Sequence, residues 1–267
     1  MSLMNGNDPQ PAACQARELL RNYTPVPLSV ANTLPSANRY DTKFLLSHSQ
    51  LIAALRFLDR YYSALDIDGI RVHRYRTLYF DTPGFDLYLR HHSGARNRFK
   101  VRSRHYVDSD RSFLEVKRKA GKNRTVKARK ETASTVTELT IEAMGFVESQ
   151  ALTGTRDLEP KLWNEFDRIT LLGNSSAERV TLDLRIGFSS GAERQRMPGL
   201  AVAELKQASI DRTSPFFRHM RSIGSRPARF SKYCVAAQLL YPQLKRNRFR
   251  KSLRAVEKLA EGAVHAA

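Results

Sequence analysis

The segment "NRFKVRSRHY", residues 97–106, carries a cation at every second position: Arg98, Lys100, Arg102 and Arg104. Successive side chains of a β-strand point to opposite faces, so a strand here would place all four cations on one side. Like charges that are neighbours on a sheet face repel each other, and their convergence is acceptable only where an anion neutralises them. Arginine suits a phosphate anion, because its planar guanidinium grips phosphate oxygens in pairs. The segment therefore predicts a strand that lines a phosphate-binding site.

The same alternation recurs elsewhere in the chain. One face would group Arg39, Asp41 and Lys43 in "RYDTKFLL", Glu115, Lys117 and Lys119 in "FLEVKRK", Arg179, Thr181, Asp183 and Arg185 in "RVTLDLRI", and Val202, Glu204 and Lys206 in "VAELK". With "RTLYFDT" and "NEFDRIT", at least seven strands are expected, and aromatic residues are scarce on their basic side. Such strands could form a flat sheet with solvated charges or a closed barrel with the charges in a wet lumen. The joint pattern favours the barrel, and about eight strands enclose room for one small ligand.

The net charge indicates the class of partner. Forty-five Lys and Arg against 26 Asp and Glu give a formal charge of +19 and an isoelectric point near 10.3. This surplus predicts a polyanion: nucleic acid, an acidic membrane surface or a phosphate-rich small molecule. We do not expect nucleic acid, because single-stranded sites combine basic grooves with stacking aromatic residues, and the aromatic residues here mostly fall opposite the charges.

The ends of the chain and its cysteines suggest where the protein resides. Residues 1–36 are rich in Pro, Asn and Ser and are expected to be a flexible leader, whereas residues 242–267 predict a basic C-terminal helix with one apolar stripe. That helix could be a solvated surface or could dock on an acidic lipid or an acidic partner. Cys14 and Cys234 give no disulfide framework. Without a signal-peptide pattern or a long apolar run, we expect a cytoplasmic protein, which could be peripheral to the inner face of a membrane.

Three segments between the strands show helical spacing. The first begins behind Ser49, the second begins at Pro215 behind a capping Ser214, and the third begins at Ser231. Lys232 falls in the first turn of the third helix, where free backbone amides and the helix dipole favour an anion.

Seven motifs together resemble a known family. "YDTKFLL", "YFDTPGFDLYLRHHSG", "KVRSRHY", "FLEVKRK", "VTLDLRIGF", "AELK" and "RFSKYC" occur in the order seen in VTC domains, the catalytic domains of the vacuolar transporter chaperone polyphosphate polymerase and its bacterial relatives. VTC domains belong to the triphosphate tunnel metalloenzymes, which are related to CYTH phosphatases and adenylate cyclases. The resemblance implies an α+β fold for residues 37–241: a closed, mostly antiparallel eight-stranded β-tunnel with a basic lumen, flanked by helices.

The resemblance also implies an activity and its residues. It implies an ATP-dependent polyphosphate polymerase that transfers the γ-phosphoryl group of a nucleoside triphosphate to a growing polyphosphate chain, assisted by Mg²⁺ or Mn²⁺. The residues that it marks as phosphate-binding are Lys43, Lys100, Arg102, Arg104, Lys117, Arg168 and Arg179. Glu204 resembles the metal-binding glutamate, and Arg229 and Lys232 resemble the paired catalytic cations near the transferred phosphate. We expect Asp183 to pair with the arginines of the lumen.

Two departures leave other functions open. CYTH proteins begin with E-x-E-x-K, where this chain has Arg39 and Asp41 ahead of Lys43, and the missing first acid is closer to the polymerase branch. Arg229 stands where the eukaryotic VTC domains have lysine. Glu204 could also act only as the ion-pair partner of Lys206. The alternatives are a CYTH-type triphosphate or polyphosphate hydrolase and a non-catalytic protein that binds polyphosphate or another polyanion.

Overall fold

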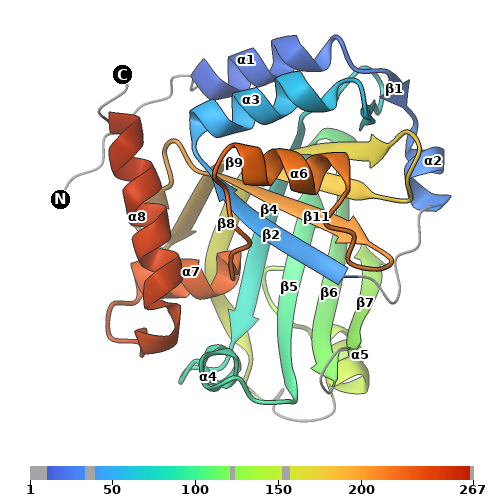
Figure 1. The fold of residues 1–267 in the computed structure, drawn as a ribbon. Helices are drawn as coiled ribbons and strands as arrows, with labels where there is room; N and C mark the ends of the chain where they lie inside the picture. The colour runs from blue at the N-terminus through green and yellow to red at the C-terminus, as the bar shows by residue number, and fades with distance from the viewer. Residues whose placement is uncertain (1–10, 34–39, 121–123, 152–156, 265–267) are drawn as a thin grey trace.

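A single large sheet with helices around it forms the body of the protein (Figure 1). This computed structural model describes residues 11–33, 40–120, 124–151 and 157–264. In sheet order, the main strands are β2 (Tyr40–Leu46), β11 (Ala201–Gln207), β9 (Arg179–Ser190), β8 (Glu159–Gly173), β4 (His73–Asp81), β5 (Arg98–Tyr106), β6 (Arg111–Ala120) and β7 (Arg124–Thr132). Every neighbouring pair in this order is antiparallel. The expected α+β fold with a mostly antiparallel sheet is confirmed.

Three short strands extend this sheet. β10 (Glu193–Arg196) pairs with β9, and β3 (Tyr62–Leu65) pairs with β8, both in antiparallel fashion. β1 (Pro25–Val26) runs parallel to β3. These additions lie at the margins of the sheet, so the eight main strands decide the shape of the site.

The sheet curls, but its backbone ladder is not closed in the part of the chain that the structure describes. β2 and β7 end the ladder, and no pairing between them is found there. The curl nevertheless brings β2 across the face of β5 and β6 (Figure 1), and Lys43 of β2 influences the pKa values of both Lys100 on β5 and Lys117 on β6. The inner face is therefore strongly concave, while a closed tunnel remains a prediction.

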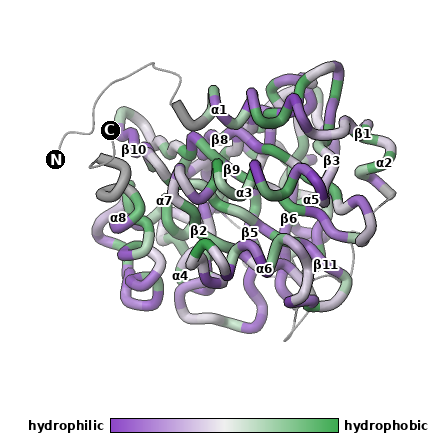
Figure 2. The backbone as a smooth tube through the Cα atoms, turned by 45° about the horizontal axis from the view of Figure 1, so that its top comes forward, coloured by the Kyte–Doolittle hydropathy of each residue, from purple (hydrophilic) through white to green (hydrophobic). Residues whose placement is uncertain are grey.

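The convex face is the apolar side of the alternating strands, and helices cover it. α1 (Pro11–Leu20), α3 (His48–Leu58) and α6 (Pro215–Ser222) pack over β2, β11, β9 and β8, and α5 (Ile141–Ala151) packs over β4, β5 and β6. Hydrophobic and hydrophilic residues alternate along the strands (Figure 2), and this alternation places the hydrophobic side chains under the helices. Burial of this apolar face removes it from water and fixes which side chains remain for the concave face.

One end of the concave face is apolar as well. Leu45, Leu162, Phe188 and Val202 point inward there and pack against α7 (Lys232–Leu240). α8 (Arg250–Val264) completes this cluster, with Leu253 and Val256 buried in it. The packing seats α7 so that its first residue, Lys232, lies beside the charged part of the concave face.

The N-terminal segment is packed against the core where the structure describes it, which corrects the expectation of a flexible leader at residues 1–36. Ala13, Ala16 and Leu20 of α1 are fully buried in the core that α3 also joins, and the Tyr23 hydroxyl donates to the Leu55 carbonyl at 2.5 Å. α2 (Leu28–Thr33) follows. The sequence indicated a possible short helix around Cys14–Tyr23, but the surrounding Pro, Asn and Ser residues gave no sign that this helix packs on the core. Residues 1–10 and 34–39 lie outside the described residues.

The three expected helices are present with small shifts at their ends. α6 begins at Pro215 behind Ser214, and α7 begins at Lys232 behind Ser231, as the capping signals predicted. α3 begins at His48, two residues earlier than expected, because Ser47 rather than Ser49 is its N-cap and forms a capping box with Gln50. The expected basic helix near the C-terminus is α8. Among the described residues, no helix is long and apolar enough to cross a membrane.

A buried aspartate joins β4 to two helices. Asp81 is fully buried and accepts hydrogen bonds from the backbone amides of Thr82, Leu87 and Tyr88 at 2.8–2.9 Å, so it holds the start of α4 (Asp86–Ser93). The Tyr233 hydroxyl of α7 donates to the same carboxylate. Because Tyr233 follows Lys232, this junction fixes the position of the first turn of α7 relative to the sheet.

Candidate functional site

The cations of β5 meet a buried carboxylate of β6. Arg102 lies opposite Glu115 in the strand register, and its Nε donates to Glu115 Oε2 at 2.7 Å. Arg104 Nε lies 3.8 Å from the same oxygen, and Lys127 Nζ of β7 lies 2.5 Å from Oε1. Burial alone would raise the pKa of Glu115, but the three cations lower it far below its usual range. One ionised carboxylate therefore organises three cations.

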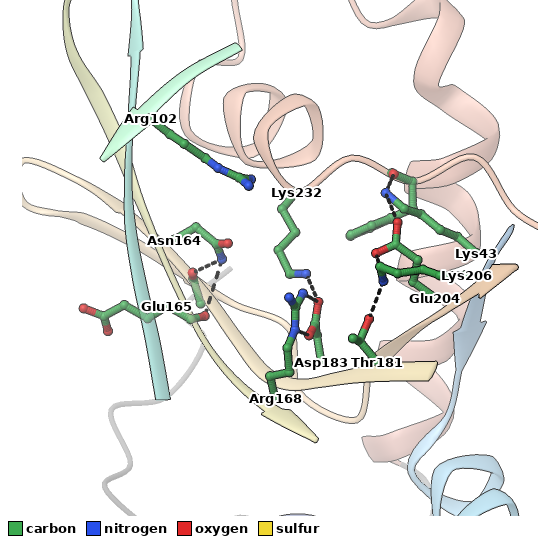
Figure 3. Close-up of polar contacts among 12 residues, drawn as sticks. Lys43, Arg102, Asn164, Glu165, Arg168, Thr181, Asp183, Glu204, Lys206 and Lys232 are labelled. Carbon is green, nitrogen blue, oxygen red and sulfur yellow. Dashed lines mark hydrogen bonds and ion pairs between the residues drawn. The ribbon is translucent and has the colours of Figure 1, made fainter. Parts of the chain in front are cut away.

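A second carboxylate joins β8, β9 and α7. Asp183 accepts a bidentate pair from Arg168, with Nε–Oδ1 at 2.6 Å and Nη2–Oδ2 at 2.8 Å, and it also accepts from Lys232 Nζ (Figure 3). This confirms the expected pairing of Asp183 with an arginine of the same face. Burial lowers the pKa of Lys232 to about 8, even though Asp183 favours its charged form.

A third carboxylate joins β11 to β2. Glu204 Oε2 accepts from Lys206 Nζ at 2.7 Å, and Glu204 Oε1 lies 3.7 Å from Lys43 Nζ (Figure 3). Lys206 also donates to Thr181 at 3.1 Å. Burial would raise the pKa of Glu204, but the two lysines hold it well below its usual range. The pairing of Glu204 with Lys206 that the sequence left open is present.

The start of α7 lies beside these groups. Lys100 Nζ donates to the Ser231 hydroxyl at 2.7 Å, and the same hydroxyl accepts from the Cys234 amide as the helix cap. Lys43 Nζ donates to the Phe230 carbonyl at 3.0 Å. The positive end of the α7 dipole therefore adds to the field of the lysines.

Together these contacts define one basic cluster. Its cations are Lys43, Lys100, Arg102, Arg104, Lys117, Lys127, Arg168, Lys206 and Lys232, and its carboxylates are Glu115, Asp183 and Glu204. Among the described residues, Lys117 makes no hydrogen bond or ion pair, and burial lowers its pKa to about 8. Cations from six strands and one helix thus share a water-poor region with too few carboxylates to neutralise them.

Two of the expected site residues lie away from the centre of this cluster. Arg179 is opposite Lys206 in the register, but its guanidinium donates to the Ala31 carbonyl of α2. Arg229 is exposed, and its backbone carbonyl accepts a hydrogen bond from Ser252 of α8. Arg98, the first cation of the β5 series, donates to the Ala95 carbonyl at 2.6 Å. Roles for Arg179 and Arg229 in phosphate binding remain predictions.

A β-bulge corrects the expected face of Arg185. The register of β8 and β9 shifts between Glu165 and Asp167, and Arg185 has a left-handed φ of 52°. Beyond the bulge the parity of β9 is reversed, so Ile186 joins the concave apolar cluster. Arg185 instead donates to Asp167 at 3.2 Å, near α1. A simple alternation cannot reveal such an inserted residue.

Comparison with protein families matches residues 38–241 to the VTC domain. The chain belongs to the VTC domain family. Comparison with curated proteins gives no match.

Solved structures similar to this VTC domain are distant. A Bacillus halodurans protein described as an adenylate cyclase candidate has a TM-score of 0.47 and 13% identity, over 73% of this chain and 95% of that chain. A Hippeastrum adenylyl cyclase candidate, described as having a dominant triphosphatase activity, has a TM-score of 0.46 and 14% identity, over 75% and 95%. A conserved hypothetical protein from Pyrococcus furiosus has a TM-score of 0.41 and 10% identity, over 73% and 99%. These similarities are too distant to indicate what this VTC domain does.

The VTC family implies a divalent metal, and the site offers few carboxylates that could bind it. The described residues contain no group of three or more His, Cys, Asp or Glu side chains that could hold an ion. Glu204 is ionised, and Asp41 lies diagonally from it on the same face, since Lys206 pairs with Asp41 and Glu204 with Lys43. Mg²⁺ is often held by one or two carboxylates together with substrate phosphates. The residues fit an ion that arrives with a phosphate ligand.

Several residues of the site were missed in the sequence. Lys127 was not singled out, although Lys127 and Arg129 alternate in "TVKARK" as the β5 cations do. The statement that aromatic side chains are scarce on the basic side is wrong, because Tyr75, Tyr79 and Phe166 lie among the arginines there. That observation removes the main reason for not expecting nucleic acid.

The role of Glu115 as a charge organiser leads to a stability prediction. We expect Glu115→Gln to lower the free energy of unfolding by about 3 kcal/mol, because three cations lose their buried counter-charge. Urea unfolding followed by circular dichroism measures this loss. Inorganic tripolyphosphate should raise the unfolding midpoint of the variant more than that of the unchanged protein.

Glu131→Gln is the matched control, because Glu131 pairs with Arg111 at the solvent-exposed end of the same face of β6 and β7. Its stability should be unchanged, since exposed ion pairs contribute little. Equal stabilisation of both variants by tripolyphosphate would show that Glu115 does not hold the cations for a phosphate ligand.

Proposed function

We propose that this VTC domain is an ATP-dependent polyphosphate polymerase, a phosphotransferase that moves the γ-phosphoryl group of a nucleoside triphosphate onto a growing polyphosphate chain. The observation that supports this proposal most is the basic cluster, in which nine cations face three carboxylates on a concave face. Buried charges of one sign need compensation. A chain of condensed phosphates supplies negative charge at regular, short intervals along such a groove.

The three carboxylates of the basic cluster keep its cations in place before a ligand binds. Without ligand, Glu115, Asp183 and Glu204 hold the cations in fixed directions. A phosphate chain could then accept from the free donors of Arg102 and Arg168 without a large rearrangement. Such preorganisation reduces the entropy that binding would otherwise cost.

The reaction itself asks the protein for position and charge. Phosphoryl transfer needs an in-line approach and neutralisation of charge on the transferred group, with little covalent work by side chains. Lys232 lies at the positive end of α7 and would bind the transferred phosphate, while Arg102, Arg104 and Arg168 would hold its neighbours. Arg229, which is exposed here, would join them only by moving inward. A Mg²⁺ or Mn²⁺ ion on Glu204 would supply further neutralisation of the phosphate oxygens.

A hydrolase is the second candidate, and one observation favours it. Asp41 occupies the second acidic position of the E-x-E-x-K pattern and lies on the same face as Glu204. Two carboxylates could hold a metal that activates water, as CYTH-type hydrolysis requires. We rank the polymerase first, because this chain has Arg39 where the E-x-E-x-K pattern has its first glutamate. The structure does not describe Arg39 itself.

Product analysis tests the polymerase directly. The purified chain with ATP and Mn²⁺ or Mg²⁺ should give ADP together with long polyphosphate, visible as a ladder on a stained gel. Glu204→Gln should lower synthesis at least about 100-fold, whereas metal-free tripolyphosphate should bind as tightly as before or more tightly, since a negative charge is lost.

Lys258→Met is the control, because Lys258 is exposed on α8, and its activity should be unchanged. Free phosphate as the sole product would favour the hydrolase. Binding of tripolyphosphate with no turnover under either metal would favour the non-catalytic binder.

The depressed lysine pKa values predict how binding depends on pH. Burial lowers the pKa values of Lys117, Lys127 and Lys232 to about 8, from about 10.4 in an unfolded chain. Between these values the unfolded chain binds more protons, so these groups make the ligand-free fold more stable as pH rises. A bound polyanion reverses the preference, because it needs the lysines charged.

ADP is a suitable ligand, because its phosphates are fully ionised above pH 7.5. We therefore expect the Kd for ADP to rise steadily from pH 7.5 to pH 9.5, which means weaker binding. Calorimetry at pH 8.5 in two buffers of different ionisation enthalpy should show uptake of protons on binding. A constant Kd with no proton uptake would contradict the assignment of these lysines to the binding site.

A further inference from the structure

A row of aromatic side chains crosses the concave face beside the basic cluster. Tyr75 of β4 is paired with Phe166 of β8 on one side and with Tyr106 of β5 on the other. The Tyr75 and Phe166 rings are stacked, with centroids 5.1 Å apart and planes 8° apart, and the Tyr75 and Tyr106 centroids are 4.9 Å apart. Directly paired residues share one face, so this aromatic row faces the same way as Arg102 and Arg168.

The outer part of the aromatic row reaches solvent. Phe166 is buried, whereas Tyr75 and Tyr106 are half-buried, and their hydroxyls have no hydrogen-bond partner among the described residues. The guanidinium carbons of Arg168 and Arg104 lie 5.1 Å and 5.7 Å from the Tyr75 ring centroid. Half-exposed rings next to arginines are what base stacking with cation–π support requires.

The next row along these strands differs in kind. Two residues from the aromatic row, β8, β4 and β5 carry Asn164, Thr77 and Arg104 in register. Asn164 Oδ1, Thr77 Oγ1 and Arg104 Nε are buried and make no hydrogen bond within the described residues, although Arg104 Nε lies 3.8 Å from Glu115 Oε2. Asn164 donates its amide to the Gly187 carbonyl at 3.0 Å, so its free atom is an acceptor, which repels a phosphate oxygen and suits a hydroxyl or a water. A bare phosphate chain does not explain this row.

The order of the rows matches the order of groups in a nucleotide. The aromatic row comes first, the mixed polar row second, and Tyr79, Arg102 and Glu115 form a third row that belongs to the basic cluster. Successive rows are two residues apart on a strand, or about 7 Å. A base, a sugar and the first phosphates of an extended nucleotide follow one another on this scale.

We propose that Tyr75 and Tyr106 form the base-stacking subsite for the nucleoside triphosphate. The base lies on the aromatic row at the end where β4 begins and β5 ends, and the phosphates extend past Arg104 toward Arg102 and Lys100. This inference rests on the proposed function, since it assumes a nucleotide ligand. It gives the groove a direction, with the nucleotide entering from the aromatic end.

The test compares two ligands that differ by the nucleoside. Kd values for ATP and for inorganic tripolyphosphate are measured by calorimetry for the unchanged chain, for Tyr106→Leu and for Tyr75→Leu. Each variant should weaken ATP binding at least about fivefold and leave tripolyphosphate binding unchanged. Tyr40→Leu is the matched control, because Tyr40 is an exposed tyrosine on β2 whose parity is opposite to that of Lys43, and it should change neither Kd.

Three outcomes would overturn the inference. If ATP and tripolyphosphate affinities fall equally, the tyrosines act on the phosphate groove as a whole; if neither falls, the base does not bind there. An unchanged chain that binds ATP no more tightly than methyl triphosphate, which carries the same charge without the base, would also exclude a base subsite, while the polymerase proposal would stand. Only a chain that binds neither ligand would remove both proposals together.

Discussion

The structure depends on the balance of charge on the inner face of one curled sheet. Arginines and lysines converge there from strands that are distant in sequence, and each of three carboxylates holds two or three of them. The charges do not balance, because half of the eight strand cations lie opposite only neutral or cationic residues in the register, as Lys100 lies opposite Lys117. A fold that buries this excess is stable by itself only to the extent that its apolar convex face compensates for the cost.

The helices on the two faces of the sheet have different roles. Those on the convex face cover the apolar side chains of the strands, whereas α7 enters the concave side and presents Lys232 and its own dipole to the cations (Figures 1 and 3). The Asp81 junction ties α7 to β4 and α4, so the position of Lys232 is set by buried contacts outside the basic cluster. The residues that fix the position of Lys232 are thus different from those that supply the charge of the basic cluster.

Much of this arrangement follows from local rules. The parity of Arg102, Lys117, Asp183 and Glu204 could be read from alternation alone, because a strand has a period of two, and the starts of α6 and α7 follow from their capping serines. What local rules could not give is the effect of tertiary context. The bulge at Arg185 reverses the parity of β9, the packing of Tyr23 against Leu55 orders the N-terminal segment, and the cross-strand neighbours of Tyr75 decide that its ring lies among arginines.

The central claim is that the cations of the inner face bind condensed phosphates within the curl of the sheet. A crystal structure of the chain with inorganic tripolyphosphate tests it most directly. The account predicts phosphate density on the concave face, with oxygens in hydrogen-bonding contact with Arg102, Arg168 and Lys232. Density confined to the outer basic surfaces such as α8, with the inner ion pairs unchanged and only water among them, would contradict it.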